Sequence, residues 1–288
     1  MTKNIETILI TGSGGFVGGN LKRYFNDKYK LLTPRSFELD CIDENAVKSY
    51  FEQNNIDFII HCGTVGGARG IQDKDTTVED NLKMVDNILS SKKDEAGVIL
   101  FGSGAMYGKS RTLHKVKESS IGEFEPLDLY GKSKLFISEK VKNRKDVICL
   151  NIFGCYGYNE KPTRFPTYAI TQNLKHEKIE INQNVVFDYL FIDDLCRIIE
   201  YFVENKPKNE NIINVTPTKS ISLLEISEIV NEISDFKSEI TIKADSLGNE
   251  YTGDNEILLK EIPDFKFTDI KDGLKIFYEY LSNQNSLF

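Results

Sequence analysis

The sequence predicts an α/β fold in which a doubly wound parallel sheet is covered by helices on both faces and followed by a smaller C-terminal α/β lobe. Three observations carry this prediction. Short apolar, strand-like runs alternate with helical patterns through the first half of the chain. These runs show little alternation of polar and apolar residues, as expected of strands buried on both faces. Glycines also gather directly after the first run, where such folds turn from strand to helix.

The first strand is expected over residues 7–11 and the first helix over residues 16–25, joined by "GSGG". Backbone N–H groups and the positive end of the helix dipole then converge where a pyrophosphate can sit. The spacing is Gly-x-x-Gly-x-x-Gly, whereas the usual dinucleotide fingerprint is GxGxxG. A tight strand-to-helix turn needs glycine with or without a ligand. On the nucleotide interpretation, the binding residues here are Gly12, Gly15, Phe16, Val17 and Gly18.

Further strands are expected at 29–32, 58–61, 97–101 and 147–151, with helices at 44–53, 78–89 and 132–141. Ligands of such sheets bind at the carboxyl ends of the strands, where Gly63 follows the third strand. The later chain predicts helices at 165–174, 223–233 and 270–281 and strands at 179–182, 212–215 and 239–243. We therefore assign residues 1–157 to a nucleotide-binding Rossmann core that is completed by about 184–217. Residues 158–183 and 218–288 form the substrate-binding lobe.

The composition of the chain limits the classes of binding partner and the cellular compartment that we expect. The chain has 288 residues, 40% hydrophobic and 28% charged, as in ordinary soluble proteins. No apolar stretch reaches the roughly 18 residues that span a bilayer. The start, "MTKNIETILITG", has too short an apolar segment for an export signal, so we expect a cytoplasmic protein without membrane contact. A net charge of −8 argues against nucleic acid as a partner, and an anionic substrate then needs a local basic pocket.

Cysteines and histidines suggest no metal site. The five cysteines are odd in number and scattered without a CxxC pair, which indicates reduced thiols. The three histidines lie far apart and show no ligand spacing. We therefore expect no bound metal.

A tyrosine and a lysine stand four residues apart in "YGKSK", at Tyr130 and Lys134. On a helix this spacing places both side chains on one face. A nearby ammonium favours the phenolate and lowers the pKa of the phenol, which makes tyrosine a usable acid and base near neutrality. The pair is not specific alone, because Tyr24 and Lys28 have the same spacing.

Context favours the second pair. Ser103 lies in "ILFGSGAMYG", directly after the fourth strand, and Tyr130 and Lys134 begin the next long helix. The strand end and the helix start can then face each other across a bound cofactor. The competing interpretation is a chance pair on an exposed helix beside a turn serine.

Taken together, TGSGGFVG, FGSGAMYG and YGKSK resemble the extended short-chain dehydrogenase/reductase family, in its nucleotide-sugar branch. The likeness covers nearly the whole chain and is closest to the GDP-fucose synthases, since "HCGTVGGARG" is similar to their VGG segment. The resemblance implies that Tyr130 is the acid/base, that Lys134 holds the nicotinamide ribose and tunes Tyr130, and that Ser103 binds the reacting oxygen. It also implies a homodimer and a role in lipopolysaccharide or capsule sugar synthesis.

Two departures from this family concern epimerisation at the carbons beside the ketone. The family uses a cysteine and a histidine, but Ala105 stands at the cysteine position and "KPTRFP" offers Thr163 or Arg164 in place of the histidine. Alanine has no proton to give, and arginine does not release its own near neutral pH. We therefore expect reduction without epimerisation.

The second strand ends in "LLTPRSFELD", where an NAD-preferring protein usually places a carboxylate. Here the first charged residue is Arg35, which suits the 2′-phosphate of NADP(H). Asp40 is better placed for the adenine, as in similar reductases. A solvated loop arginine is the alternative interpretation.

The diphosphate of a nucleotide sugar needs cations, and candidates are Arg69, Lys161 and Arg164, although each could equally be ordinary surface charge. Gly67 and Tyr189 complete the expected substrate site. Phe187 stands where the family often carries an arginine, so the phosphate contacts must differ. Asp193 and Asp194 are expected to cap a helix rather than to catalyse.

The predicted function is an NADPH-dependent C4-keto reductase of a nucleoside-diphosphate 4-keto-6-deoxy sugar, hexose or heptose, with GDP favoured. Two alternatives stay open. One is an NAD-dependent nucleotide-sugar 4-epimerase, which shares the serine, tyrosine and lysine. The other is a non-catalytic NADP-sensing protein, against which the intact Ser103, Tyr130 and Lys134 argue.

Overall fold

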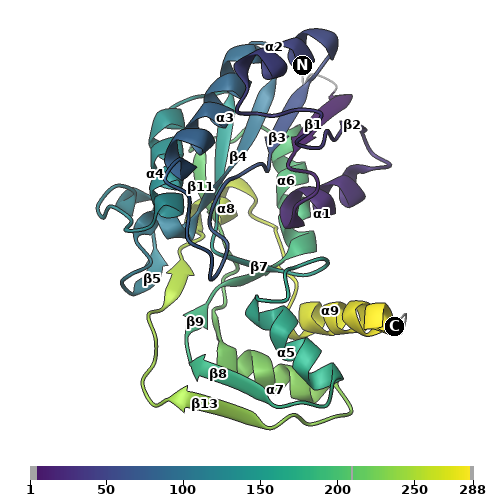
Figure 1. The fold of residues 1–288 in the computed structure, drawn as a ribbon, viewed down its shortest axis with the longest axis vertical. Helices are drawn as coiled ribbons and strands as arrows, with labels where there is room; N and C mark the ends of the chain where they lie inside the picture. The colour runs from purple at the N-terminus through teal and green to yellow at the C-terminus, as the bar shows by residue number, and fades with distance from the viewer. Residues whose placement is uncertain (1–4, 209, 286–288) are drawn as a thin grey trace.

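The computed structural model describes residues 5–208 and 210–285, and its centre is a six-stranded parallel sheet (Figure 1). The strand order across the sheet is β11 (Ile212–Val215), β6 (Val147–Ile152), β4 (Gly97–Ser103), β3 (Phe58–His61), β1 (Thr7–Thr11) and β2 (Lys30–Leu32). The strand neighbouring β1 on one side is β2 and on the other is β3. The chain therefore reverses its direction of travel across the sheet at β1, which is where such sheets bind ligands at their carboxyl ends.

Both faces of this sheet are buried, because successive side chains of a strand point to opposite faces. Ile8 and Ile10 belong to one core cluster and Leu9 to the other, and all three are fully buried. The first cluster contains residues of α1 (Phe16–Phe25) and α6 (Ile192–Glu204). The second contains residues of α2 (Glu44–Gln53), α3 (Thr77–Ser91) and α4 (Leu129–Val141). The prediction of a doubly covered parallel sheet is thus confirmed.

The C-terminal lobe lies below this sheet in Figure 1. Its parallel strand pair β8 (Ile179–Gln183) and β13 (Ile240–Ala244) packs with α5 (Phe165–Leu174), α7 (Leu223–Ile233) and α9 (Ile270–Asn285). α8 (Glu256–Glu261) returns to the core and contacts β11, so the later chain does not lie wholly in the lobe. No helix of the described residues is both long and apolar enough to cross a bilayer.

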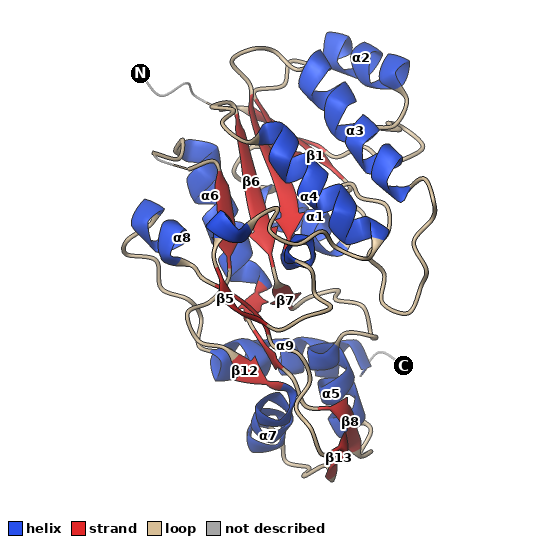
Figure 2. Ribbon diagram, turned by 90° about the vertical axis from the view of Figure 1, so that its left-hand side faces the viewer, coloured by secondary structure: helices blue, strands red, loops and turns tan. Residues whose placement is uncertain are grey.

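Short strands between the core and the lobe were not predicted. A four-stranded sheet has the order β12 (Ile221–Ser222), β9 (Val186–Phe187), β14 (Tyr251–Gly253) and β5 (Leu113–Val116), and β7 (Gly154–Tyr156) pairs with β10 (Tyr189–Phe191). Figure 2 shows β5 and β12 between the core sheet and α7. Two single turns, η1 (Gly104–Tyr107) and η2 (Glu118–Ser120), flank β5 in sequence. These strands have two to four residues, too few for a periodic pattern.

The prediction that Asp193 and Asp194 cap a helix is wrong in detail. Phe191 is the N-cap residue of α6, and both aspartates lie in the first turn. Asp193 forms a salt bridge with Arg23 on α1. Asp194 is buried and accepts hydrogen bonds from the backbone N–H and hydroxyl of Thr268. The two carboxylates therefore attach other segments to α6, and the favourable position at the helix N-terminus is an additional effect.

Candidate active site

The glycine-rich loop joins β1 to α1 with little room for side chains. Gly12 has φ +65°, and a Cβ there would lie 2.6 Å from the backbone nitrogen of Gly63. A Cβ at Gly18 would overlap the carbonyl oxygen of Gly12. Gly15 is the N-cap residue of α1, and no side chain caps the helix there. No side chain of the described residues accepts a hydrogen bond from the first N–H groups of α1, at Phe16 and Val17, and this arrangement fits a pyrophosphate.

Arg35 lies over this loop. A Cβ at Gly14 would be 3.1 Å from Nη1 of Arg35, so the guanidinium packs directly against the loop backbone. The backbone N–H of Arg35 donates a 2.7 Å hydrogen bond to Glu38, which fixes the turn that presents the side chain. Asp40 is exposed and its carboxylate accepts a hydrogen bond from the N–H of Ile42. This local hydrogen bond accounts for the position of the Asp40 side chain. The contact of Asp40 with an adenine stays a prediction.

Tyr130 and Lys134 lie on the first two turns of α4, which Asp128 caps through the N–H of Gly131. Lys134 is 6% exposed, and its ammonium donates a 2.9 Å hydrogen bond to the carbonyl of Phe101. The ammonium nitrogen lies 5.5 Å from the centre of the Tyr130 ring. The lysine is therefore held between strand β4 and the ring of Tyr130, one turn along the same helix.

The pair Tyr24 and Lys28, which has the same spacing, has a different environment. The phenol of Tyr24 donates to Glu200 and the ammonium of Lys28 binds the same carboxylate. Burial and this carboxylate raise the pKa of the Tyr24 phenol. A phenol with a raised pKa beside a carboxylate is a poor acid/base near neutral pH.

Ser103 is the last residue of β4 and caps the short helix η1, its Oγ accepting a 3.2 Å hydrogen bond from the N–H of Ala105. The carbonyl of Ala105 packs against Gly131, where a Cβ would lie 2.9 Å from it. The end of β4 and the start of α4 are therefore in direct contact. The structure thus brings Ser103, Tyr130 and Lys134 to the carboxyl end of the parallel sheet.

His61 lies near this cluster at the end of β3, but it is an unsuitable acid. Its ring Nδ1 is 2.7 Å from the Thr11 hydroxyl. Burial, and then the charge of Lys134, lower the pKa of His61 to about 3. The imidazole is therefore neutral near pH 7 and serves as a hydrogen-bonding core residue.

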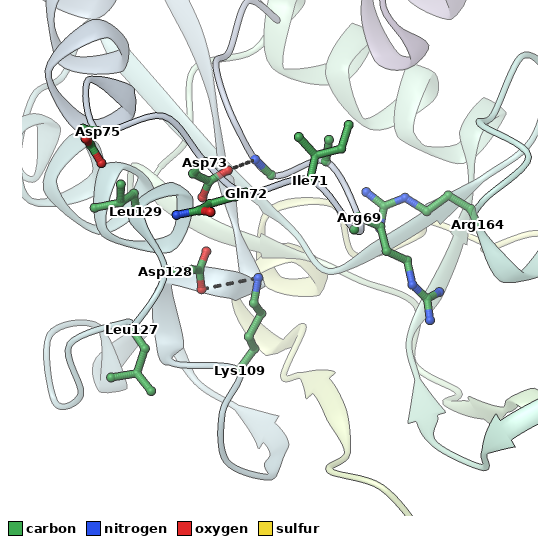
Figure 3. Close-up of a pocket in the computed structure, with 13 residues that line it drawn as sticks. Arg69, Ile71, Gln72, Asp73, Asp75, Lys109, Leu127, Asp128, Leu129 and Arg164 are labelled. Carbon is green, nitrogen blue, oxygen red and sulfur yellow. Dashed lines mark hydrogen bonds and ion pairs between the residues drawn. The ribbon is translucent and has the colours of Figure 1, made fainter. Parts of the chain in front are cut away.

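A cavity of about 540 Å³ opens beside Asp128 and Leu129, at the start of α4 (Figure 3). Gly67 forms part of its wall with φ +73°, and a Cβ there would lie 2.8 Å from the Tyr130 ring. Arg69 and Arg164 lie together on one side of the cavity, and Lys109 pairs with Asp128 on another. Among the described residues neither arginine forms a salt bridge, so both guanidinium groups are available to an anionic ligand.

Tyr189 is near the same arginines, whereas Lys161 is not at the cavity. The pKa of the Tyr189 phenol is raised chiefly by burial and by Glu160, and Arg69 and Arg164 act in the opposite direction. Lys161 is exposed and is not among the residues that line the cavity. Its role in substrate binding therefore rests on sequence position alone.

Sequence reasoning missed two residues that shape this site. Asp73 accepts hydrogen bonds from the N–H groups of Gly67 and Tyr130 and so joins the loop after β3 to α4. Tyr251 places its hydroxyl against Gly104, next to Ser103. Asp73 lies in an irregular loop and Tyr251 in a three-residue strand, so neither had a periodic signal. No described group of histidine, cysteine, aspartate or glutamate is arranged to hold a metal ion.

The sheet order, the reversal at β1 and the glycine-rich loop define the chain as a Rossmann-type α/β protein. Residues 8–216 match the NAD dependent epimerase/dehydratase family. This match spans more than half of the chain, which therefore belongs to that family. The predicted membership in the extended dehydrogenase/reductase family, in its nucleotide-sugar branch, is confirmed.

Relatives and a solved structure agree with this assignment. The chain is 25% identical to the GDP-L-colitose synthase of Yersinia pseudotuberculosis, over 97% of this chain and 99% of that protein. It is also 25% identical to the ADP-L-glycero-D-manno-heptose-6-epimerase of Brachyspira hyodysenteriae, over 95% and 97% of the two chains. The fold is similar to that of a GDP-mannoheptose C4 reductase from Campylobacter jejuni with NADP bound. The TM-score is 0.82 at 19% identity, over 98% of this chain and 99% of that one.

Proposed function

We propose that this protein is an NADPH-dependent C4-keto reductase of a nucleoside-diphosphate 4-keto-6-deoxy sugar. One observation carries the proposal: Ser103, Tyr130 and Lys134 lie together at the carboxyl end of the sheet, near a cavity whose two guanidinium groups form no salt bridge with a described residue. This arrangement joins a proton donor to a site for an anionic substrate.

NADP(H) is the proposed cofactor, in agreement with the NADP bound in the similar reductase structure. The free N–H groups at the start of α1 would hold its pyrophosphate and Arg35 its 2′-phosphate, with Gly63 adjoining Gly12 beneath them. Lys134 would bind the nicotinamide ribose. When bound, NADPH supplies the hydride that reduces the ketone.

The residues of this chain then handle the proton and the developing charge. Ser103 and Tyr130 donate hydrogen bonds to the ketone oxygen and polarise it. Tyr130 transfers its proton to the oxygen as the alkoxide forms. The Lys134 ammonium, held by the Phe101 carbonyl, stabilises the resulting phenolate.

Arg69 and Arg164 are the proposed ligands of the substrate diphosphate, with Gly67 and Tyr189 beside the sugar and Lys161 as an outer cation. GDP is the favoured nucleotide because two of the similar proteins act on GDP-sugars by name, although a third acts on an ADP-sugar. Ala105 is buried and Arg164 keeps its proton, so neither is an acid/base for epimerisation beside the ketone.

The decisive experiment is a panel of GDP-, ADP-, CDP- and dTDP-linked 4-keto-6-deoxy sugars, assayed by NADPH absorbance with the product identified by NMR. We expect consumption of one NADPH per product, with the GDP-sugar preferred. Interconversion at C4 of the corresponding 4-hydroxy nucleotide sugars, with no NADPH consumed, would identify a 4-epimerase instead. NADPH binding without turnover of any sugar would indicate a sensing protein. Sedimentation of the same sample tests the predicted homodimer.

A further inference from the structure

Tyr251 is a third hydroxyl beside the catalytic cluster, contributed by a strand far away in the sequence. It begins β14, which pairs with β5 through Leu113 and with β9 through Phe187. A Cβ at Gly104 would lie 2.5 Å from the Tyr251 hydroxyl oxygen. That oxygen is therefore in contact with the residue that follows Ser103.

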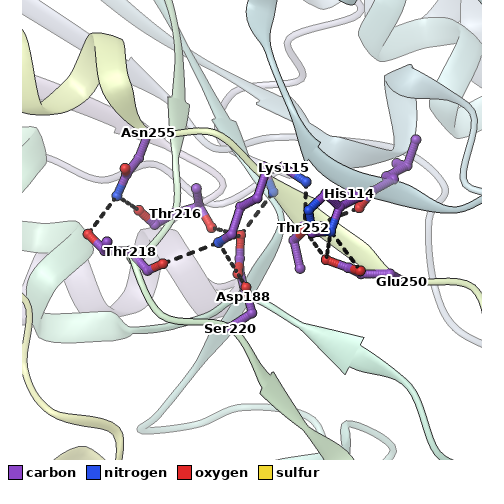
Figure 4. Close-up of polar contacts among 11 residues, drawn as sticks. His114, Lys115, Asp188, Thr216, Thr218, Ser220, Glu250, Thr252 and Asn255 are labelled. Carbon is purple, nitrogen blue, oxygen red and sulfur yellow. Dashed lines mark hydrogen bonds and ion pairs between the residues drawn. The ribbon is translucent and has the colours of Figure 1, made fainter.

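A buried network fixes the strand that carries Tyr251 (Figure 4). Asp188 is fully buried. Its carboxylate accepts a 2.9 Å hydrogen bond from the N–H of Gly253 and forms a 3.2 Å salt bridge with the ammonium of Lys115. The N–H of Lys115 in turn donates a 2.8 Å hydrogen bond to the hydroxyl of Thr252. Both residues that follow Tyr251 are thus held by named partners, which limits how far its hydroxyl can move.

The ring of Tyr251 is fixed by packing. Its centre lies 5.3 Å from the ring centre of Phe153 and 5.8 Å from that of Phe187. Aromatic pairs at such distances stabilise a defined ring orientation. The hydroxyl is therefore directed at Gly104 by strand and ring contacts that do not depend on the hydroxyl itself.

The contact of Tyr251 matters for the reaction because the Ser103 hydroxyl can form only a limited number of hydrogen bonds. A serine hydroxyl donates one hydrogen bond and accepts two. The N–H of Ala105 occupies one acceptor position. Burial raises the pKa of the Tyr251 phenol, and the nearby Ser103 hydroxyl lowers it by less, so the phenol keeps its proton near neutral pH.

We propose that Tyr251 is a positioning residue that donates a hydrogen bond to Oγ of Ser103. With both acceptor positions filled, the hydrogen of Ser103 is left to point at the substrate carbonyl oxygen. Tyr251 thereby makes Ser103 an obligate donor in the reduction. The inference deepens the proposed function and rests on it.

The test is a double-mutant cycle of Tyr251→Phe and Ser103→Ala, with Tyr130→Phe as a reference. Tyr251→Phe keeps the ring contacts and removes only the hydroxyl. We expect it to lower kcat by about 5- to 10-fold with little change in KM or in NADPH affinity, as the loss of one hydrogen bond predicts. In the Ser103→Ala background the same change should have no further effect. Tyr278→Phe is the matched control, because it removes another lobe hydroxyl, which donates to Asn173.

Each other outcome overturns the inference. Unchanged kcat in Tyr251→Phe means that the hydroxyl does not act on Ser103. An effect that multiplies with that of Ser103→Ala means that it acts elsewhere. A loss of NADPH affinity means that the hydroxyl supports packing only. If Tyr130→Phe is inactive in these cases, the proposed function stands without Tyr251; if Tyr130→Phe retains turnover, the proposed function itself is wrong.

Discussion

The ammonium of Lys134 lies 5.5 Å from the ring centre of Tyr130 while it donates a hydrogen bond to the carbonyl of Phe101. The backbone of the sheet, rather than the phenol of Tyr130, therefore sets the position of the Lys134 charge. Placement by the backbone matters because a misplaced charge would lose most of its effect on an acid/base residue.

Tyr130→Phe removes the proposed proton donor and leaves the ring against Gly67. We expect kcat to fall by at least about 100-fold, the usual contribution of general acid catalysis. NADPH affinity, measured by fluorescence titration, should stay within a factor of about two, because no cofactor group loses a charged partner. Tyr24→Phe is the matched control, since its hydroxyl donates to Glu200. Near-normal turnover of Tyr130→Phe would remove the residue from this role.

Arg35→Ala tests the cofactor choice. A charge-assisted hydrogen bond to the 2′-phosphate is worth roughly 1.5 to 3 kcal/mol, so the preference for NADPH over NADH should fall by about 10- to 100-fold. The measurement is the ratio of kcat/KM for the two cofactors. Arg23→Ala provides the comparison, because this exposed arginine pairs with Asp193. An unchanged ratio in Arg35→Ala would assign the guanidinium to the loop surface alone.

Gly67→Ala should damage the site more than Gly70→Ala does. Both glycines have positive φ, +73° and +75°, so alanine strains the backbone at both positions. Only at Gly67 would the new methyl group meet the Tyr130 ring, at 2.8 Å, whereas nothing lies within 4 Å at Gly70. We expect kcat/KM to fall at least about 10-fold further in Gly67→Ala, as displacement of a reacting group predicts. Equal losses in both variants would show that the ring contact is unimportant.

The absence of an acid/base pair for epimerisation is tested by isotope incorporation. Reduction in heavy water with NADPH should yield product without deuterium at C3 or C5. Ala105 and Arg164 can neither take a proton from these carbons nor return one near neutral pH. Mass spectrometry and NMR of the product provide the measurement. Deuterium at either carbon, above the level of an enzyme-free sample, contradicts the expectation.

Glu160 makes stability depend on pH. Burial raises the pKa of this carboxyl from 4.5 to about 8, against the hydrogen bond from Thr167 and the charge of Arg164. Between these two pH values the folded chain holds one proton more than the unfolded chain does. The free energy of unfolding therefore falls as pH rises through this window, by up to about 1.4 kcal/mol per pH unit, and levels off above it.

Glu160→Gln removes this contribution because the amide does not ionise. The stability of the variant relative to the wild type should rise from about pH 5 to about pH 8 in denaturant titrations, as the linkage relation requires. Glu177→Gln, at an exposed glutamate, is the control and should show no such trend. A pH-independent difference between wild type and Glu160→Gln would mean that the carboxyl titrates alike in both states.

Most of the core could be predicted from the sequence. Its strands are apolar runs buried on both faces, and its helices carry one apolar face. The predicted helix at 165–174 and the strand at 212–215 have the bounds seen in the structure. Boundaries shifted where end residues carry little information: the helix expected at 132–141 begins at Leu129, since Asp128 provides the cap. Five predicted helices begin where the structure has them, whereas the third helix, α3, and the last, α9, run two and four residues past their predicted ends.

The candidate site could be predicted only where one element carries the signal. Tyr130 and Lys134 share a helix, and the glycines share a turn, so spacing alone places them. Tyr251 lies 148 positions beyond Ser103 in the chain and meets it through a pairing of two short strands. Such a contact depends on tertiary packing, which a single sequence does not display.

The pairing of β14 with β5 also bears on how the protein is made. During translation, residues 1–217 emerge first and contain the glycine-rich loop, the serine, the tyrosine and the lysine. β5 is then still unpaired, because the N–H of Leu113 donates to the carbonyl of Glu250, 137 positions further along the chain. A nascent chain stopped before that point has an unpaired strand edge beside an incomplete pocket, exposed to the ribosome surface and to other chains. The edge closes only after residues 250–253 have been synthesised and β14 can pair with β5.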